Sequence, residues 1–227
     1  MKRILIVVLV CTLLFSLATS AIAEAKMTVT KKNLIAIEGE NTAYFYAKVE
    51  NTGDSAGYIE YGGKLVGFNA SDEIILQEDY VGSSPSNIKL APGEYAYVSE
   101  YIIEDVLRTD TVTDCKFSIK TEEYGSDYSK IPCEAKLELS EDEYENYVYV
   151  TFTNDTDSIL YNFAITVVVY DQNGELVFVD GDYTSSIGIH PGSTITIKAG
   201  IDSDLVRHYT KNEITPTTVE ALVYIED

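Results

Sequence analysis

The feature that most constrains the fold is a two-residue alternation of apolar and polar positions through the stretch 147–192. Val148 and Val150 alternate with polar or tyrosine residues, and a second alternating run covers 163–169 after a polar corner. Because successive side chains of a β-strand point to opposite faces, the pattern predicts strands with one buried and one solvated face. The Asn-Gly pair at Asn173 is typical of a tight hairpin turn. The stretch therefore predicts half of a β-sandwich.

The same pattern occurs twice along the chain. Residues 43–51 align with residues 146–154, which places Asn51 and Asn154 103 residues apart. Two further features recur in the same order: Pro-Gly turns at Pro92 and Pro191, and Asp-hydrophobic-hydrophobic-Arg elements starting at Asp105 and Asp204. We expect each of these two aspartates to cap a single helical turn that joins two strands.

A repeat of this length indicates two tandem domains, because each copy has enough alternating strands to close its own core. We predict an all-β protein of two tandem immunoglobulin-like β-sandwich domains related by this internal repeat. The expected divisions are a signal peptide at 1–23, a first sandwich at 24–121, a linker at 122–132 and a second sandwich at 133–227.

The N-terminus has the three parts of a secretory signal peptide. Lys2 and Arg3 precede an apolar run over 4–17, and small residues lead to Ala23, so cleavage before Glu24 is the simplest expectation. The alternative is an uncleaved anchor, but the run is shorter than the about 20 residues that span a bilayer. We expect a secreted protein, extracellular or held at the cell envelope, with no membrane insertion after signal cleavage.

Charge and cysteine content narrow the partners further. The chain has 37 Asp and Glu against 16 Lys and Arg, a net charge of −21, which argues against nucleic acid and anionic lipid as partners. Cys115 and Cys133 remain after processing and flank the expected linker. In an oxidising compartment they favour a disulfide that closes a loop of about 18 residues and contributes about 3 kcal/mol. Two buried free thiols are the alternative.

A strand in the second copy ends in Val167-Val168-Val169-Tyr170-Asp171, and its counterpart in the first copy is Leu65-Val66-Gly67-Phe68-Asn69. With the preceding Asn corner and the later Pro-Gly turn, the second copy resembles the bacterial extracellular FxLYD-type domains and related small immunoglobulin-like sandwiches. Only the Tyr-Asp pair agrees literally with the motif. The resemblance implies an extracellular, non-enzymatic module and supplies no ligand and no site residue.

The candidate binding surface comes from tyrosine in a chain without tryptophan. Alternation places four tyrosines on the outer face of two neighbouring strands: Tyr44, Tyr46, Tyr95 and Tyr97. Such rings bury large area and keep a polar tip, so an exposed platform of this kind suits a protein or glycan partner. Ordinary cross-strand pairing explains the same residues. The second copy keeps tyrosine at Tyr147 and Tyr149 but has Thr194 and Thr196 opposite them.

Metal and catalytic sites have less support. The best places for a calcium ion are Asp155 and Asp157 in the second Asn corner, with Asp54 as a partial counterpart, and Asp180-Gly181-Asp182, although Asx turns account for them too. His190 and His208 accompany no nucleophile or metal-ligand motif, so we expect no enzyme. The sequence favours a non-catalytic binding or adhesion module for an extracellular protein or glycan. The alternatives are a structural spacer or self-assembling envelope subunit and, less favoured, a hydrolase on a sandwich.

Overall fold

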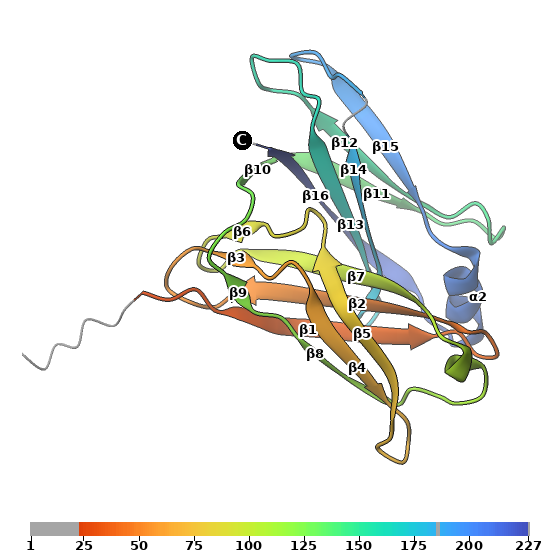
Figure 1. Ribbon diagram of the computed structural model, residues 1–227. Helices are drawn as coiled ribbons and strands as arrows, with labels where there is room; N and C mark the ends of the chain where they lie inside the picture. Colours follow the sequence, from red (N-terminus) through yellow and green to blue (C-terminus); the bar gives the residue numbers. More distant parts are fainter. Residues whose placement is uncertain (1–22, 185–186, 227) are drawn as a thin grey trace, which may run out of the picture.

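Antiparallel β-strands make up nearly all of the regular structure (Figure 1). The structure is a computed structural model that describes residues 23–184 and 187–226. The prediction of an all-β fold is confirmed. Except for Ala23, the expected signal peptide lies outside the described residues. No helix in the described ranges is long and apolar enough to cross a membrane.

The N-terminal half, residues 23–127, contains one large and one small sheet. Its elements are β1 (Met27–Ala36), β2 (Thr42–Asn51), β3 (Gly57–Ile59), β4 (Gly63–Phe68), β5 (Ile74–Ser83), β6 (Lys89–Leu90), β7 (Tyr95–Ile103), the 3-10 turn η1 (Asp105–Arg108), β8 (Asp114–Ser118) and β9 (Thr121–Glu122). The large sheet has the order β1-β2-β7-β5-β4-β8, and the small one β6-β3-β9. Phe45, Ala47 and Val49 of β2 are fully buried, as their alternation predicts.

The C-terminal half, residues 128–226, contains two sheets that face each other. Its elements are β10 (Tyr128–Ile131), β11 (Cys133–Glu138), β12 (Tyr147–Thr153), β13 (Phe163–Asp171), β14 (Leu176–Thr184), β15 (Thr194–Gly200), α2 (Ser203–Lys211) and β16 (Pro216–Glu226). The sheet orders are β10-β16-β13-β14 and β11-β12-β15. Part of the expected linker is therefore a strand, because β10 pairs with β16.

The Asn corners have the same hydrogen bonds in both halves. Asn51 and Asn154 are fully buried, and each amide nitrogen donates to two carbonyl oxygens, namely Ser55 (2.8 Å) and Leu90 (2.9 Å), and Ser158 (2.8 Å) and Ile189 (2.7 Å). Each amide oxygen also accepts a backbone N–H two residues later. A buried amide needs all of these partners. The repeated asparagine is therefore a corner that connects neighbouring strands.

The Tyr-Asp turn also has a counterpart. Oδ1 of Asp171 accepts the backbone N–H groups of Asn173 and Glu175, both at 2.8 Å. Oδ1 of Asn69 accepts those of Ser71 and Glu73, at 2.9 and 3.0 Å. In both halves this side chain closes the hairpin that follows its strand, and so sets the register of the next strand.

The helical connections differ from our expectation. Asp105 is the first residue of η1, and the residue before it provides no side-chain cap. In the second copy Asp202, not Asp204, is the N-cap, and its carboxylate accepts the Asp204 N–H. The element there is a nine-residue helix, not a single turn. Leu205 and Tyr209 of this helix are buried, so packing against the sheets extends it beyond one turn.

The two halves pack face to edge. β14 is an edge strand of its sheet, and it lies against β1, β2 and β7 of the N-terminal half (Figure 1). Ile35, Tyr44, Tyr46 and Tyr97 consequently belong to the same hydrophobic cluster as the core of the C-terminal half. The apolar interior thus continues across the junction.

Candidate functional site at the junction of the two halves

The four tyrosines predicted as a binding platform do lie together, on the outer face of β2 and β7. Their predicted exposure is wrong. Tyr44, Tyr46 and Tyr97 are 7%, 2% and 1% exposed, and Tyr95 is half-buried. The C-terminal half covers this face, because β14 packs across β1, β2 and β7. Alternation shows which face of a sheet carries a residue but not what lies over that face.

Two of these tyrosines are anchored to one carboxylate of β16. The Tyr95 hydroxyl donates to Oε1 of Glu220 at 2.6 Å, and the Tyr97 hydroxyl to Oε2 at 2.8 Å. The hydroxyl oxygens of Tyr97 and Tyr170 are 2.5 Å apart. Burial raises the pKa of Tyr97, and the hydrogen bond to Tyr170 and the charge of Glu220 raise it further. The phenols therefore stay protonated and hold the two halves together with charge-assisted hydrogen bonds.

A close backbone approach adds to this junction. A Cβ on Gly181 of β14 would lie 2.3 Å from Cβ of Ser84, so only glycine fits there. Three side chains hydrogen-bond to carbonyl oxygens across the junction: Lys31 to Gly174 (2.8 Å), Asn33 to Leu176 (2.7 Å) and Thr166 to Ser84 (2.5 Å). These contacts give the two halves one relative orientation.

The uncovered end of the tyrosine face forms a pocket of about 350 Å³, called the acidic pocket below. It is lined by both halves: Tyr44, Tyr46, Ser99, Glu100, Tyr101, Phe178, Val179, Asp180, Gly200 and Asp202. The lining contains three carboxylates and three tyrosines, and no lysine, arginine or histidine. The acidic pocket therefore combines tyrosine rings with negatively charged side chains.

Tyr44 lies in the acidic pocket with its hydroxyl close to Asp202. This hydroxyl is buried and makes no well-aligned hydrogen bond among the described residues, although the Asp202 carboxylate is near enough to interact with it. Its ring centroid is 5.2 Å from that of Tyr101 and 6.5 Å from that of Tyr46. Burial raises the pKa of Tyr44, and a hydrogen-bond interaction with the Asp202 carboxylate and the negative charge of that group raise it further. Because this oxygen is buried, a ligand in the acidic pocket would not reach it without a shift of the neighbouring side chains.

Glu100, Asp180 and Asp202 take part in none of the ion pairs found among the described residues, although Lys198 lines a neighbouring cavity together with Asp180. Desolvation, with a contribution from Glu78, raises the pKa of Glu100. Desolvation raises the pKa of Asp180 as well, the hydrogen bond from the Gly181 N–H partly offsets this effect, and the charge of Asp182 adds to it. Raised carboxyl pKa values mean that the negative charges are poorly compensated. A positively charged ligand close to Glu100 and Asp180 would stabilise the ionised form of both carboxylates.

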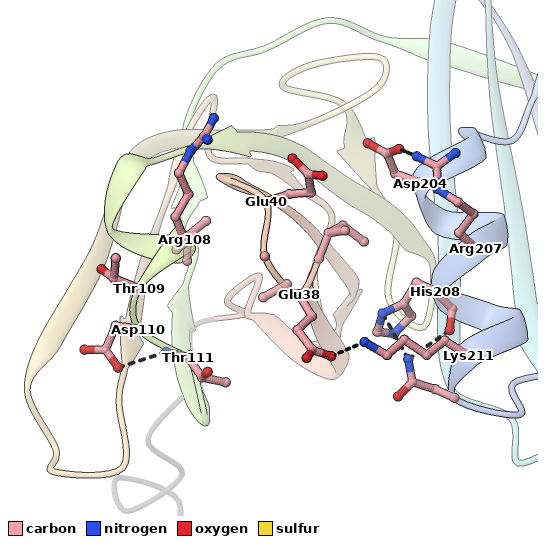
Figure 2. Close-up of a pocket in the computed structure, with 15 residues that line it drawn as sticks. Glu38, Glu40, Arg108, Thr109, Asp110, Thr111, Asp204, Arg207, His208 and Lys211 are labelled. Atoms are coloured by element: carbon pink, nitrogen blue, oxygen red, sulfur yellow. Dashed lines mark hydrogen bonds and ion pairs between the residues drawn. The ribbon is translucent and has the colours of Figure 1, made fainter.

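A second cavity, of about 530 Å³ and called the charged cleft below, opens beside α2 (Figure 2). The turn between β1 and β2, η1 and α2 contribute its walls. Figure 2 shows Glu38 reaching across to Lys211, with which it forms an ion pair. Arg207 pairs with Asp204 and, at 3.0 Å, with Glu143. Most charges of this cleft are thus already paired.

The other predicted site residues are not brought together. Asp155 and Asp157 are both exposed in the Asn corner. Within the described ranges, no group of three or more His, Cys, Asp or Glu side chains is placed to hold a metal ion. His208 lines the charged cleft, where burial and then Lys211 lower its pKa, while His190 is exposed in its turn.

The predicted disulfide is absent, since Cys115 and Cys133 are free thiols. Cys115 belongs to the apolar cluster of the N-terminal half. Cys133 packs against that of the C-terminal half, and its thiol donates to the Ala221 carbonyl at 3.3 Å. Burial raises the pKa of both thiols. Packing, not a covalent bridge, connects the halves.

Sequence reasoning missed the C-terminal side of the junction. Glu220 and Tyr170 occupy the positions of Lys116 and Phe68 in the repeat. This change in residue type between the copies was visible in the alignment and marks a contact that only one copy makes. Asp202 was missed because the repeat drew attention to Asp204.

The comparisons with known proteins are distant. No protein-family model matches the chain, and no curated protein matches its sequence. A red sea bream transglutaminase structure is 10% identical, with 88% of this chain and 30% of that chain covered and a TM-score of 0.27. The C-terminal globular domain of an oligosaccharyltransferase from Pyrococcus abyssi is 8% identical, with 88% and 47% covered and a TM-score of 0.25. The chain thus spans less than half the length of either.

Proposed function

We propose that the chain is a secreted, non-catalytic binding module that recognises an extracellular protein or glycan through a cationic group held in the acidic pocket. In this proposal two tandem immunoglobulin-like sandwiches are fixed against each other. The repeated Asn corners and hairpin-closing side chains support the tandem arrangement. The signal-peptide pattern of the N-terminus supports export.

The observation that carries the proposal is the composition of the acidic pocket. An ammonium or guanidinium group is attracted by tyrosine ring faces and by desolvated carboxylates. The pocket offers the exposed ring of Tyr101, and it offers the carboxylates of Glu100, Asp180 and Asp202. Its carboxylates are not grouped as metal ligands, so an organic cation is a better fit than a metal ion. A lysine or arginine side chain or an amino sugar has this chemistry.

The first experiment measures binding of matched probes by calorimetry. A lysine-containing peptide and a chitosan oligomer should bind, whereas the acetyl-lysine peptide and the N-acetylated oligomer should not, because acetylation removes the positive charge. Equal binding of the acetylated probes, or no binding of either cationic probe, would contradict the proposal.

A variant in the pocket identifies the site. Asp202→Asn removes a charge but keeps the α2 cap, since Asn and Asp are equally good N-cap residues. We expect about tenfold weaker binding, equivalent to about 1.4 kcal/mol. Glu138→Gln, an exposed position on β11, is the matched control and should bind as the parent does. Unchanged affinity of Asp202→Asn would move the site elsewhere.

The self-assembling alternative has weaker support. In a head-to-tail array, the outer face of β11-β12-β15 would pack against the next copy of the chain. That contact would have to resemble the packing of β14 on β1-β2-β7 within one chain. Thr194 and Thr196 replace the anchoring tyrosines there, and Lys116 replaces the acceptor Glu220 on the opposite surface. Both sides of the contact are therefore missing. Size-exclusion elution that is independent of concentration is the expected result, and growth into larger species would favour the alternative.

A further inference from the structure

We propose that the mature chain begins at Glu24 and that its new α-ammonium group is bound by the carboxylate of Asp54. The inference assumes the export on which the proposed function rests. Two small-residue exits lie at the end of the apolar run: Ala21-Ile22-Ala23 leads to a cut before Glu24, and Ala23-Glu24-Ala25 to a cut before Lys26. The sequence pattern alone fits both.

The packing of Ala25 distinguishes the two cuts. Ala25 is buried, whereas Ala23 and Glu24 are exposed. Its carbonyl oxygen accepts a hydrogen bond from the Thr121 hydroxyl at 3.2 Å. A Cβ on Gly57 would lie 2.4 Å from the Ala25 Cβ, so the chain makes room for this methyl group. A cut before Lys26 would discard a residue of the folded body, and a cut before Glu24 would not.

Asp54 already holds the nitrogen that the cut would free. The backbone nitrogen of Glu24 donates to Oδ1 of Asp54 at 2.6 Å, and the backbone nitrogen of Asp54 donates to the Glu24 carbonyl at 3.1 Å. Gly53 makes this approach possible, because a Cβ there would lie 2.1 Å from the Glu24 carbonyl oxygen. The first residue of the proposed mature chain is therefore held on both sides of its α-carbon.

Cleavage changes the chemistry of this contact without moving its atoms. A signal peptidase hydrolyses the Ala23–Glu24 bond: the C–N bond breaks, the hydroxide of water ends on the Ala23 carbonyl carbon as a carboxylate, and the Glu24 nitrogen takes up protons. A neutral amide donor becomes an ammonium, and hydrogen bonds between charged groups are about twice as strong as neutral ones. The other charges at this site are the Glu24 side chain and Lys26. Maturation would thus strengthen the first contact of the fold.

The cut is tested by the intact mass of the exported protein. A mass that begins at Glu24 with a free amine is expected. A start at Lys26 or upstream of Glu24 would overturn the assignment. So would a mass lower by one water, because cyclisation of Glu24 to a lactam removes the ammonium.

The ammonium contact is tested independently of export, with two purified chains made by cutting a fusion directly before Glu24 or before Ala21. In the Glu24 chain, Asp54→Asn should lower the midpoint of thermal unfolding by about 2 to 4 °C. In the longer chain the nitrogen is an uncharged amide, so the loss should be clearly smaller. Equal losses in both chains would overturn the contact while leaving the proposed binding function untouched.

A glycine variant checks that the geometry and not only the charge matters. Gly53→Ala pushes against the Glu24 carbonyl and should speed acylation of the α-amine at neutral pH, because the amine is released from Asp54. Gly200→Ala is the matched control, since a Cβ at Gly200 would meet no atom within 4 Å. An α-amine that reacts at the same rate in the parent, Gly53→Ala and Asp54→Asn chains would show that it is not held.

Discussion

The outer faces of two equivalent three-strand groups, β1-β2-β7 and β11-β12-β15, have opposite surroundings. The first is covered by the C-terminal half and buries Tyr44, Tyr46 and Tyr97. The second is solvated: Tyr147 and Tyr149 are only half-buried there. Its threonines pair across strands, with hydroxyl oxygens 2.8 Å apart for Thr151 and Thr196 and 2.7 Å apart for Thr153 and Thr194. The same strand pattern therefore makes a junction in one copy and a free surface in the other.

Residue type at equivalent positions of the two copies explains why one face is covered and the other is solvated. Tyrosine at 95 and 97 meets Glu220 in the junction, while threonine stands at the equivalent positions 194 and 196. A threonine hydroxyl on a sheet face is satisfied by its cross-strand neighbour or by water, whereas a buried tyrosine hydroxyl requires a partner. The residue type at these positions thus indicates which face must be covered.

The largest expected loss of stability comes from replacing a tyrosine of the covered face, and the equivalent change on the solvated face gives a direct comparison. Tyr97→Ala removes a fully buried ring and two hydrogen bonds, so the free energy of unfolding should fall by about 3 to 5 kcal/mol. The matched variant Thr196→Ala, at the equivalent exposed position, should change it by less than about 0.5 kcal/mol. Urea unfolding at neutral pH measures both. Similar losses would mean that the junction contributes no more than the free face.

The second-largest loss of stability is expected from removal of Glu220, which accepts the hydrogen bonds of Tyr95 and Tyr97. Glu220→Ala leaves the Tyr95 hydroxyl without its acceptor and leaves Tyr97 with only the Tyr170 hydroxyl, and a buried donor without a partner costs about 1 to 3 kcal/mol. In a Tyr95→Phe/Tyr97→Phe background the same change should cost less than half as much. Thr218→Ala, exposed on the same strand, is the control. A loss that is independent of the background would exclude coupling across the junction.

The backbone approach at Gly181 should have an effect of similar or smaller size. Gly181→Ala introduces a methyl group 2.3 Å from Ser84, and overpacking of this kind costs about 1 to 3 kcal/mol. Adding Ser84→Gly should recover most of the loss, because it removes the atoms that the new methyl group meets. Gly200→Ala should be neutral. Thermal unfolding of the four proteins decides the matter, and a failure of Ser84→Gly to rescue would contradict this contact.

The smallest effect concerns alkaline pH. Because the pKa of Tyr97 is raised in the folded protein, the unfolded phenol ionises first, near pH 10. The contribution of Tyr97 to stability is therefore complete below about pH 10 and is lost as the pH rises further. Tyr97→Phe should show a less steep loss of stability between neutral pH and pH 11. The same pH dependence in both proteins would exclude Tyr97 as a source of it.

Much of the local structure was predictable. The inward positions of β2 and β12, the Asn corners and the turn at Asp171 follow from alternation and from the hydrogen-bonding needs of short polar side chains. The helix at Ser203–Lys211 is longer than the single turn that the sequence predicts, because its length depends on how Leu205 and Tyr209 pack. The proposed disulfide failed for a related reason: sequence spacing does not show that Cys115 and Cys133 face different cores.

By itself the sequence determined the strands, their faces and the positions of their corners, because alternation and turn-forming residues are patterns of neighbouring residues. The tertiary structure alone decided that the tyrosine face is a junction and that its uncovered end is an acidic pocket. Those features require contacts such as Tyr97 with Tyr170 and Tyr95 with Glu220, which are 73 and 125 residues apart. No local pattern specifies which of two similar faces the rest of the chain will cover, because that choice depends on the combined packing of both halves.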